Sequence, residues 1–228
     1  MCGRFTAANP VLIGKMVFEE FDLHWPHQPA RFNVAPSHLL RVIARNEDQP
    51  PEARDMRWGL VPFWDKSEKP KIAPINAKSE EITAKPMFRQ AVQKRRCLVP
   101  ADGFFEWKRL SEDLKQPYLI GLADSRPFYF AGIFEPGNET RPATVALLTT
   151  RPNALMEAIH TRMPVILNGE SAKAWLRAGP LSPDELGRLT SPFPAEQMHA
   201  VPVSKLVNNP RNDSADLLVP NRIDQLPI

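Results

Sequence analysis

The stretch RCLVPADGFFEWKRL, residues 96–110, holds two strand-like runs joined by a short polar break. Residues 96–100 are mostly apolar, and residues 103–110 combine aromatic side chains with charged ones, which is typical of strands. Similar runs follow at residues 117–122, 127–134 and 144–150, with short polar, proline or glycine breaks between them. This succession predicts antiparallel pairing and not an alternation of strands with crossover helices.

The segments on either side of this run predict further strands and short helices. Strands are expected at residues 39–45 and 54–60, and they can pair across the Pro50–Pro51 turn. In residues 10–23 a proline precedes Leu12, Met16 and Phe21 on one helical face, which predicts a helix packed on a sheet. Other helices are expected at residues 86–96, 152–160 and 171–178, and a late strand within residues 199–207.

These elements predict an α+β fold. We expect one domain over residues 1–228, with a curved, barrel-like, mainly antiparallel β core and flanking short helices. Residues 66–71 are expected to form a surface loop, and residues 210–228 a loosely attached tail.

The composition is that of a soluble globular protein, with 43% hydrophobic and 24% charged residues. The sequence has no signal pattern and no apolar run long enough for a membrane span, so an intracellular, cytoplasmic protein without a membrane partner is expected. Cys2 and Cys97 are too few for a disulfide framework or a cysteine-built zinc site. The net charge of +3 permits a nucleic-acid partner without requiring one.

The chain begins MCGRF, so removal of Met1 would place a free α-amine and a thiol on Cys2. Both groups ionise near neutral pH, and a modest shift in either pKa would give a nucleophile. The alternative is that a cysteine at this position has no function.

Two polar residues in apolar surroundings are candidates for chemistry. Asn76, in INAKSEE (75–81), can orient a nucleophile through its amide or can simply form a turn. Glu106 lies between Phe105 and Trp107, so alternation puts it on the opposite face of the strand from these two rings. That face is either exposed to solvent or turned into a cleft, where a higher pKa would suit proton transfer.

His160 and Arg162, in IHTRMP (159–164), are a candidate proton donor beside an anion contact, although a lone histidine can equally be structural. Pro36 and Trp64 offer flat faces on which bases can stack, or they belong to the core. A phosphate-binding glycine loop, an HExxH motif and a CxxC pair are all missing from the sequence. We therefore expect chemistry without a metal or a nucleotide cofactor.

The order of the motifs resembles the SRAP family, the SOS-response-associated peptidases, whose members shield abasic sites in single-stranded DNA. The resemblance covers residues 2–208. It is carried by MCGRF (1–5), RFNVAP (31–36), RWGLVPFW (57–64), INAKSE (75–80), CLVPADGFFEW (97–107) and IHTRMPVIL (159–167).

The resemblance implies that Cys2, once Met1 is removed, bonds covalently to the ring-opened abasic sugar. It also implies that Glu106 and His160 handle protons and that Asn76 positions the amine. The chemistry of an aminothiol predicts the product, because the amine forms a Schiff base with the aldehyde and the thiol then closes a thiazolidine ring. The family's name fits self-removal of Met1.

The resemblance further implies contacts of Arg4 and Arg162 with the DNA backbone, and of Pro36 and Trp64 with flanking bases. The family usually has NAR where this chain has NAK, so Lys78 keeps the positive charge but loses the bidentate fork of arginine. The expected partner is abasic single-stranded DNA, and the expected state is a monomer.

Two other functions use some of the same residues. In an N-terminal-nucleophile amidohydrolase or cysteine peptidase, the Cys2 thiol would attack a carbonyl carbon. In a non-catalytic reader of single-stranded or modified DNA, aromatic and basic side chains would suffice.

Overall fold

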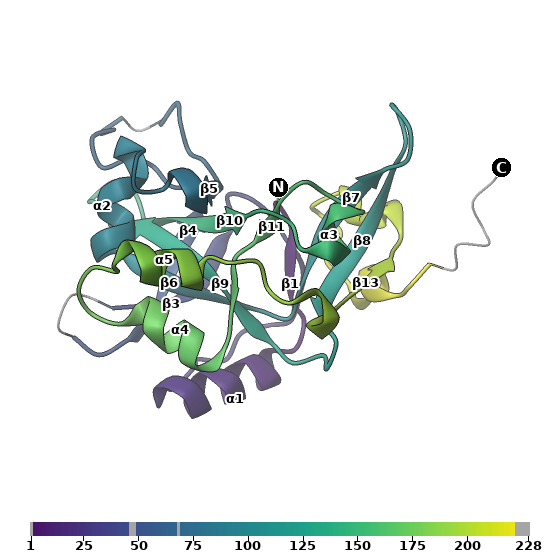
Figure 1. The fold of residues 1–228 in the computed structure, drawn as a ribbon, viewed down its shortest axis with the longest axis horizontal. Helices are drawn as coiled ribbons and strands as arrows, with labels where there is room; N and C mark the ends of the chain where they lie inside the picture. The colour runs from purple at the N-terminus through teal and green to yellow at the C-terminus, as the bar shows by residue number, and fades with distance from the viewer. Residues whose placement is uncertain (1, 46–48, 68, 222–228) are drawn as a thin grey trace.

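Five strands close into a barrel within residues 2–45, 49–67 and 69–221, which the computed structural model describes (Figure 1). The strands are β3 (Leu39–Ala44), β4 (Glu52–Trp58), β6 (Arg96–Ala101), β9 (Phe128–Glu135) and β10 (Thr144–Thr150). Hydrogen-bonded pairs link them in the cyclic order β3, β4, β10, β9, β6. Only the β4–β10 pair of this ring is parallel, so the predicted α+β fold with a barrel-like, mainly antiparallel core is confirmed.

Strand β10 carries two short strands that hold candidate site residues. β5 (Asn76–Lys78) runs parallel to β10, with Asn76 opposite Leu147. β11 (Met163–Pro164) runs antiparallel to it, with Pro164 opposite Thr149. The segments around residues 76 and 162, far apart in the sequence, therefore meet at one edge of the barrel.

A second, open sheet packs beside the barrel. Its strands are, in spatial order, β13 (Met198–Pro202), β8 (Lys115–Leu122), β7 (Gly103–Arg109), β1 (Phe5–Ala7) and β2 (Arg31–Val34). Phe5 of β1 pairs with Phe104 of β7, which brings the start of the chain beside the strand that contains Glu106. Aromatic rings then join the sheet to the barrel, because Phe5 contacts Trp58 and Phe130 edge to face.

The two faces of β7 are buried against different parts of the molecule. Phe104 packs in the main core with Cys2, whereas Phe105 packs against the C-terminal residues Val203, Val207 and Leu217. Glu106 lies on the face of Phe104, because residues two apart in a strand share a face. The alternative that Glu106 faces solvent is therefore wrong.

Most of the helices cover the outside of the barrel, whereas the short helix α3 lies beside the open sheet (Figure 1). The α-helices are α1 (Pro10–Phe21), α2 (Pro86–Lys94), α3 (Ala154–Glu157), α4 (Gly169–Leu176) and α5 (Pro183–Leu189). In α1 Ile13 and Val17 are buried in the core. Of the predicted face, Met16 and Phe21 pack against the same core, whereas Leu12 is exposed, so the prediction is wrong for Leu12 alone. The Asn9 side chain accepts a hydrogen bond from the Leu12 N–H and caps the start of this helix.

The remaining elements are short. β12 (Ile166–Leu167) adds to β9, and the 3-10 helices are η1 (Ser79–Glu81), η2 (Ala195–Gln197), η3 (Lys205–Asn208) and η4 (Ala215–Leu218). The expected late strand is shorter than predicted and ends at Pro202. Two residues later, Ser204 caps the start of η3 by accepting a hydrogen bond from the Leu206 N–H. The expected surface loop at residues 66–71 lies between β4 and β5, with residue 68 outside the described residues.

The expected loose attachment of the tail is wrong for residues 210–221. The Asp213 carboxylate accepts hydrogen bonds from the backbone N–H groups of Phe32 and Asn33. Leu217 is buried, and the Asn221 N–H donates to Pro202 O at 2.8 Å. Residues 222–228, where the rest of the expected tail falls, lie outside the described residues. Among the helices of the described part, none is long and apolar enough to cross a membrane.

Candidate active site

Cys2 lies just before β1 and is fully buried in the main core. Its Sγ is 3.9 Å from Arg4 O. Burial raises the pKa of the thiol above its ordinary value, and the nearby negative charge of Glu106 raises it further. The thiol is thus held neutral at physiological pH, and a base must take its proton before the sulfur can act as a strong nucleophile.

Glu106 is 2% exposed and approaches both Cys2 and His160. Burial raises its pKa, and the positive charge of His160 opposes that rise. A carboxyl with a raised pKa keeps its proton at a higher pH than an ordinary glutamate, which suits a group that gives and takes protons near neutral pH.

Asn76 fixes the backbone of Cys2. Its Nδ2 donates a hydrogen bond of 2.8 Å to Cys2 O. Its Oδ1 is buried and accepts no hydrogen bond from the described residues. A buried, unused acceptor beside a nucleophile is unusual, and it can receive an N–H of the reacting group.

His160 follows α3, and its ring is fixed by the backbone of Arg162. Nδ1 lies 3.1 Å from the Arg162 N–H nitrogen and 3.2 Å from Arg162 O. The neutral ring can accept from the N–H at Nδ1 and carry its proton on Nε2, whereas the charged ring can donate from Nδ1 to the carbonyl. Both protonation states therefore have a partner without movement of the ring.

Arg162 and Lys78, the two cations expected to bind phosphates at this site, both have carboxylate partners from η1. Arg162 donates from Nη1 and Nη2 to the two carboxylate oxygens of Glu80, at 2.7 and 2.8 Å. Lys78 Nζ lies 3.7 Å from Glu81 Oε1. Lys78 shares a strand face with Asn76, since the two are separated by one residue of β5 and the intervening Ala77 is buried.

Arg4 points to the C-terminal segment. Its guanidinium donates to Asn33 Oδ1 at 2.9 Å, to Val207 O at 2.8 Å and to Asn208 O at 3.3 Å. These bonds give Arg4 a structural task, and its expected phosphate contact stays a prediction.

Trp64 lies on the long loop between β4 and β5, whose ends meet where the Leu60 N–H donates to Pro74 O. Its side chain is 49% exposed and contacts Phe63 edge to face, so the alternative that Trp64 belongs to the core is wrong.

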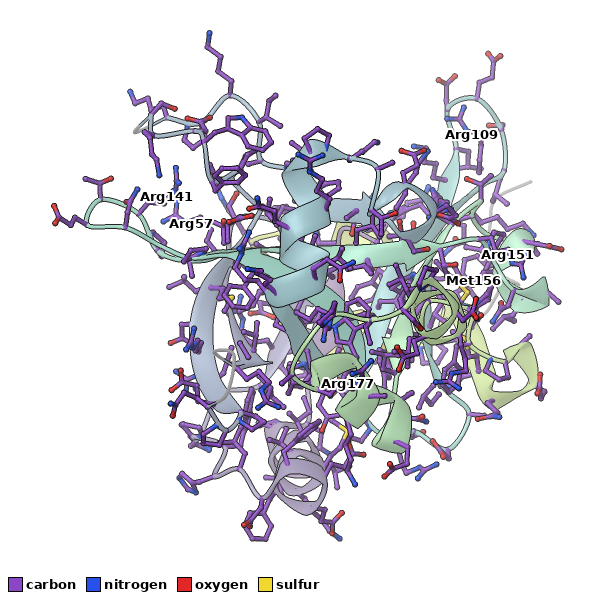
Figure 2. All side chains as sticks on the ribbon, turned by 60° about the vertical axis from the view of Figure 1, so that its left-hand side comes forward. Arg57, Arg109, Arg141, Arg151, Met156 and Arg177 are labelled. Atoms are coloured by element: carbon purple, nitrogen blue, oxygen red, sulfur yellow. The ribbon has the colours of Figure 1, made fainter. Side chains whose placement is uncertain are left out.

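Arg141 holds this loop in place by donating from both terminal nitrogens to Asp65 O. Figure 2 shows Arg141 and Arg57 on one side of the molecule, and Arg151 and Met156 on the other. Pro36 is partly buried in the turn between β2 and β3.

Sequence reasoning missed Glu80 and Asn33. Glu80 lies 82 residues before Arg162, and no local pattern links them. Asn33, fully buried, donates to the carbonyl oxygens of Val207, Asn209 and Asn212. The only sequence signal for Asn33 is a polar side chain inside the strand-like stretch RFNV. In the described part of the chain, no group of three or more His, Cys, Asp or Glu side chains could hold a metal ion.

Comparisons with known proteins identify the family of the chain. The chain is 42% identical over 223 residues to the abasic site processing protein YoqW of Bacillus subtilis, covering 96% of this chain and 99% of that protein. It is 32% identical over 232 residues to the abasic site processing protein YedK of Escherichia coli, covering 96% and 100%.

Another relative is the abasic site processing protein HMCES of Rattus norvegicus, which is 35% identical over 198 residues, covering 72% of this chain and 56% of that protein. A crystal structure of a protein from Bacteroides thetaiotaomicron superposes with a TM-score of 0.80 at 27% identity, covering 97% of this chain and 100% of that one. The family SOS response associated peptidase (SRAP) matches residues 1–210. The chain therefore belongs to the SRAP family.

Proposed function

We propose that this protein processes abasic sites by forming a covalent thiazolidine crosslink between Cys2 and the ring-opened sugar in single-stranded DNA. The observation that carries the proposal is that three distant segments meet at Cys2: Asn76 bonds to its backbone and Glu106 lies near its thiol, with His160 near Glu106. The names of the relatives supply the substrate, a DNA abasic site.

The reaction begins with the Cys2 amine, which is free only after Met1 is removed. The amine nitrogen adds to the aldehyde carbon of the open sugar, and loss of water leaves an imine. The Cys2 sulfur then bonds to the imine carbon as the thiol loses its proton, and the imine nitrogen takes up the electron pair of the broken π bond together with a proton, so no net proton is lost. The product is a five-membered ring containing both sulfur and nitrogen.

The raised pKa of the thiol supports this order. A thiol held neutral by burial is a poor first nucleophile, whereas it closes a ring readily once the imine carbon lies next to it. Glu106, close to the thiol, can accept the thiol proton at ring closure. The same carboxyl, when protonated, can supply the proton that leaves with water.

Asn76 and His160 have supporting tasks in this proposal. The hydrogen bond from Asn76 to Cys2 O fixes the residue while leaving its nitrogen and sulfur free to react. The unused Asn76 Oδ1 accepts an N–H of the amine or of the ring nitrogen. His160, held by Arg162 in either protonation state, exchanges protons with the sugar hydroxyl.

DNA is held, in this proposal, by cations and flat side chains around the site. Lys78 shares the strand face of Asn76, and Arg162 is two residues from His160, which suits contacts with the phosphates beside the abasic sugar. Trp64 is exposed on a loop whose base adjoins Asn76, so a flanking base can stack on it, and Pro36 is proposed as a second such contact.

The deciding experiment is incubation of protein with abasic single-stranded DNA, followed by a denaturing gel. The protein should first be shown by mass to lack Met1. We expect a band that survives denaturation with abasic DNA, and none with intact DNA of the same sequence.

Each rival function predicts a different outcome. Failure of wild-type protein to give a stable band would overturn the crosslinking proposal. Cleavage of amide substrates without a crosslink would indicate an N-terminal-nucleophile hydrolase. Undiminished DNA binding by Cys2→Ala, again with no wild-type crosslink, would indicate a non-catalytic reader.

A further inference from the structure

The guanidinium of Arg162, which the proposed function needs for a DNA phosphate, is already bound to Glu80 in a bidentate ion pair. Both carboxylate oxygens of Glu80 accept from Arg162, one from Nη1 and the other from Nη2. A phosphate oxyanion would use the same pair of parallel N–H groups, because carboxylate and phosphate fit the guanidinium fork in the same way.

Few donors of Arg162 remain for a second anion. Nη2 also donates to Thr149 O at 2.7 Å. Nε is buried and makes no hydrogen bond with the described residues. One N–H of Nη1 is left, which is too little for a bidentate contact. Phosphate binding in the bidentate mode therefore requires Glu80 to leave.

The exposure of the two side chains indicates which one moves. Arg162 is 16% exposed and anchored to β10 through Thr149, whereas Glu80 is 48% exposed on the short helix η1. Glu80 can swing into water and be solvated there, while Arg162 stays in place.

We propose that Glu80 is a specificity-determining residue that competes with DNA phosphate for Arg162 and so weakens binding of undamaged single strands. This inference rests on the proposed function. Because Glu80 does not touch the reacting atoms, it alters the grip on DNA and not the rate of ring formation. The protein then releases intact DNA readily, and the covalent bond supplies the durable attachment at an abasic sugar.

Glu81, the next residue, is a weaker competitor. Its carboxylate contacts Lys85 at 2.5 Å and lies 3.7 Å from Lys78. Since Lys85 already neutralises Glu81, Lys78 is the less restrained of the two phosphate-binding cations. The competition therefore acts mainly at Arg162.

The test compares Glu80→Gln with a matched control, Asp55→Asn. Asp55 makes a similar bidentate pair with Arg41, at 2.9 and 2.8 Å, but on the barrel strands β3 and β4. The exposed fractions of the side chains also match, at 21% for Arg41 and 48% for Asp55, against 16% for Arg162 and 48% for Glu80. Both substitutions raise the net charge by the same amount, so the control reports the general effect of charge on DNA binding.

We expect Glu80→Gln to bind intact single-stranded DNA roughly two- to five-fold more tightly than Asp55→Asn, the range that loss of an exposed ion pair allows. With abasic DNA, the concentration for half-maximal crosslinking should fall by the same factor, and the rate at saturation should stay unchanged. The Kd of Glu80→Gln for DNA should also rise more steeply with salt concentration than the wild-type Kd. In the wild type, salt also weakens the Arg162–Glu80 ion pair that phosphate must displace, and this partly offsets the loss of DNA affinity.

Either of two results with Glu80→Gln alone would overturn the inference, as would a third result in Arg162→Ala. One is equal DNA affinity for Glu80→Gln and Asp55→Asn. The other is weaker binding by a Glu80→Gln protein that melts at the wild-type temperature, which would make Glu80 a support that orients Arg162. The gain should also vanish in Arg162→Ala, and its persistence there would exclude the proposed route. Failure of the proposed function looks different, because wild-type protein would then give no stable crosslink with abasic DNA, whether or not it bound DNA.

Discussion

At the scale of single residues, the site depends on how burial changes the acidity of Cys2 and Glu106. Both groups have a raised pKa, mainly because the folded chain removes them from water. Folding therefore buries two ionisable groups whose charged forms are disfavoured, at the place where protons must move, which is common in active sites.

Cys2→Ser separates the two reactive groups of that residue. Serine keeps the α-amine but replaces the thiol with a much weaker nucleophile, so we expect the imine to form and the ring to stay open. Borohydride should trap this adduct, whereas without reduction it should be lost on denaturation. The wild-type adduct should survive without reduction. If a folded, DNA-binding Cys2→Ser protein gave no trappable adduct, the sulfur would have to attack first.

Glu106→Gln tests the raised pKa through stability. Below the unfolded-state value of about 4.5, the carboxyl is protonated in both states and its burial costs little. As the pH rises, the unfolded chain loses its proton first, so wild type loses stability until the native carboxyl also ionises. The melting temperature of Glu106→Gln should thus exceed that of wild type by an increasing margin as the pH rises above about 4.5, until the native carboxyl also ionises.

A difference in melting temperature that stays constant with pH would contradict the raised pKa. Glu135, whose pKa burial also raises, is present in both proteins, so its contribution cancels. The same variant should form the crosslink slowly while binding DNA normally, since an amide cannot exchange the proton.

At the scale of elements, the C-terminal segment is tied to β1 and β2 by polar side chains. Asn33 donates to carbonyls at residues 207, 209 and 212, and Arg4 donates to residues 207 and 208. Phe105 and Trp107 of β7 pack beneath this segment. The segment thereby covers the face of β7 opposite to the one that carries Glu106.

Asn33→Ala should lower the free energy of unfolding by about 1–3 kcal/mol, because it leaves buried carbonyl groups without donors. Chemical denaturation measures this change, and limited proteolysis should show faster cleavage after residue 204. Asn138→Ala is the control, since Asn138 is exposed in a turn. Equal losses in the two variants would mean that Asn33 contributes no more than a surface residue.

At the scale of the whole molecule, Arg96 joins the barrel to its helical cover. Its guanidinium donates to Val92 O and Gln93 O in α2, to Trp175 O in α4, and to Arg177 O and Gly179 O after α4. Burial lowers the pKa of Arg96 to about 10, which still leaves it charged at neutral pH. A positive charge is favourable at the carboxyl end of a helix, and here one side chain serves two helices.

Arg96→Met should keep the volume of the side chain but leave these carbonyls without partners. We expect a loss on the order of 3 kcal/mol, which corresponds to a melting temperature lower by roughly 6–12 °C for a chain of this size. Arg126→Met, at a largely exposed arginine, is the control and should melt within about 2 °C of wild type. A similarly small shift for Arg96→Met would show that water replaces the guanidinium at no cost.

The sequence by itself determined the longer strands, most of the helices and the family, but it did not predict the short strands β1, β2, β5, β11 and β12 or the helix α5. Alternation, apolar runs and proline at helix starts are local signals, and each acts within a few residues. The motifs also named Cys2, Asn76, Glu106 and His160, which the structure brings together.

Only the tertiary structure decided which way Glu106 faces, because both faces of β7 are covered and alternation cannot tell one buried face from the other. It also decided that Arg162 meets Glu80, and that residues 210–221 pack on β2. Those contacts join segments far apart in the chain, and their partners are fixed by closure of the barrel and by strand register. Such pairings depend on the whole fold, so no local pattern in the sequence encodes them.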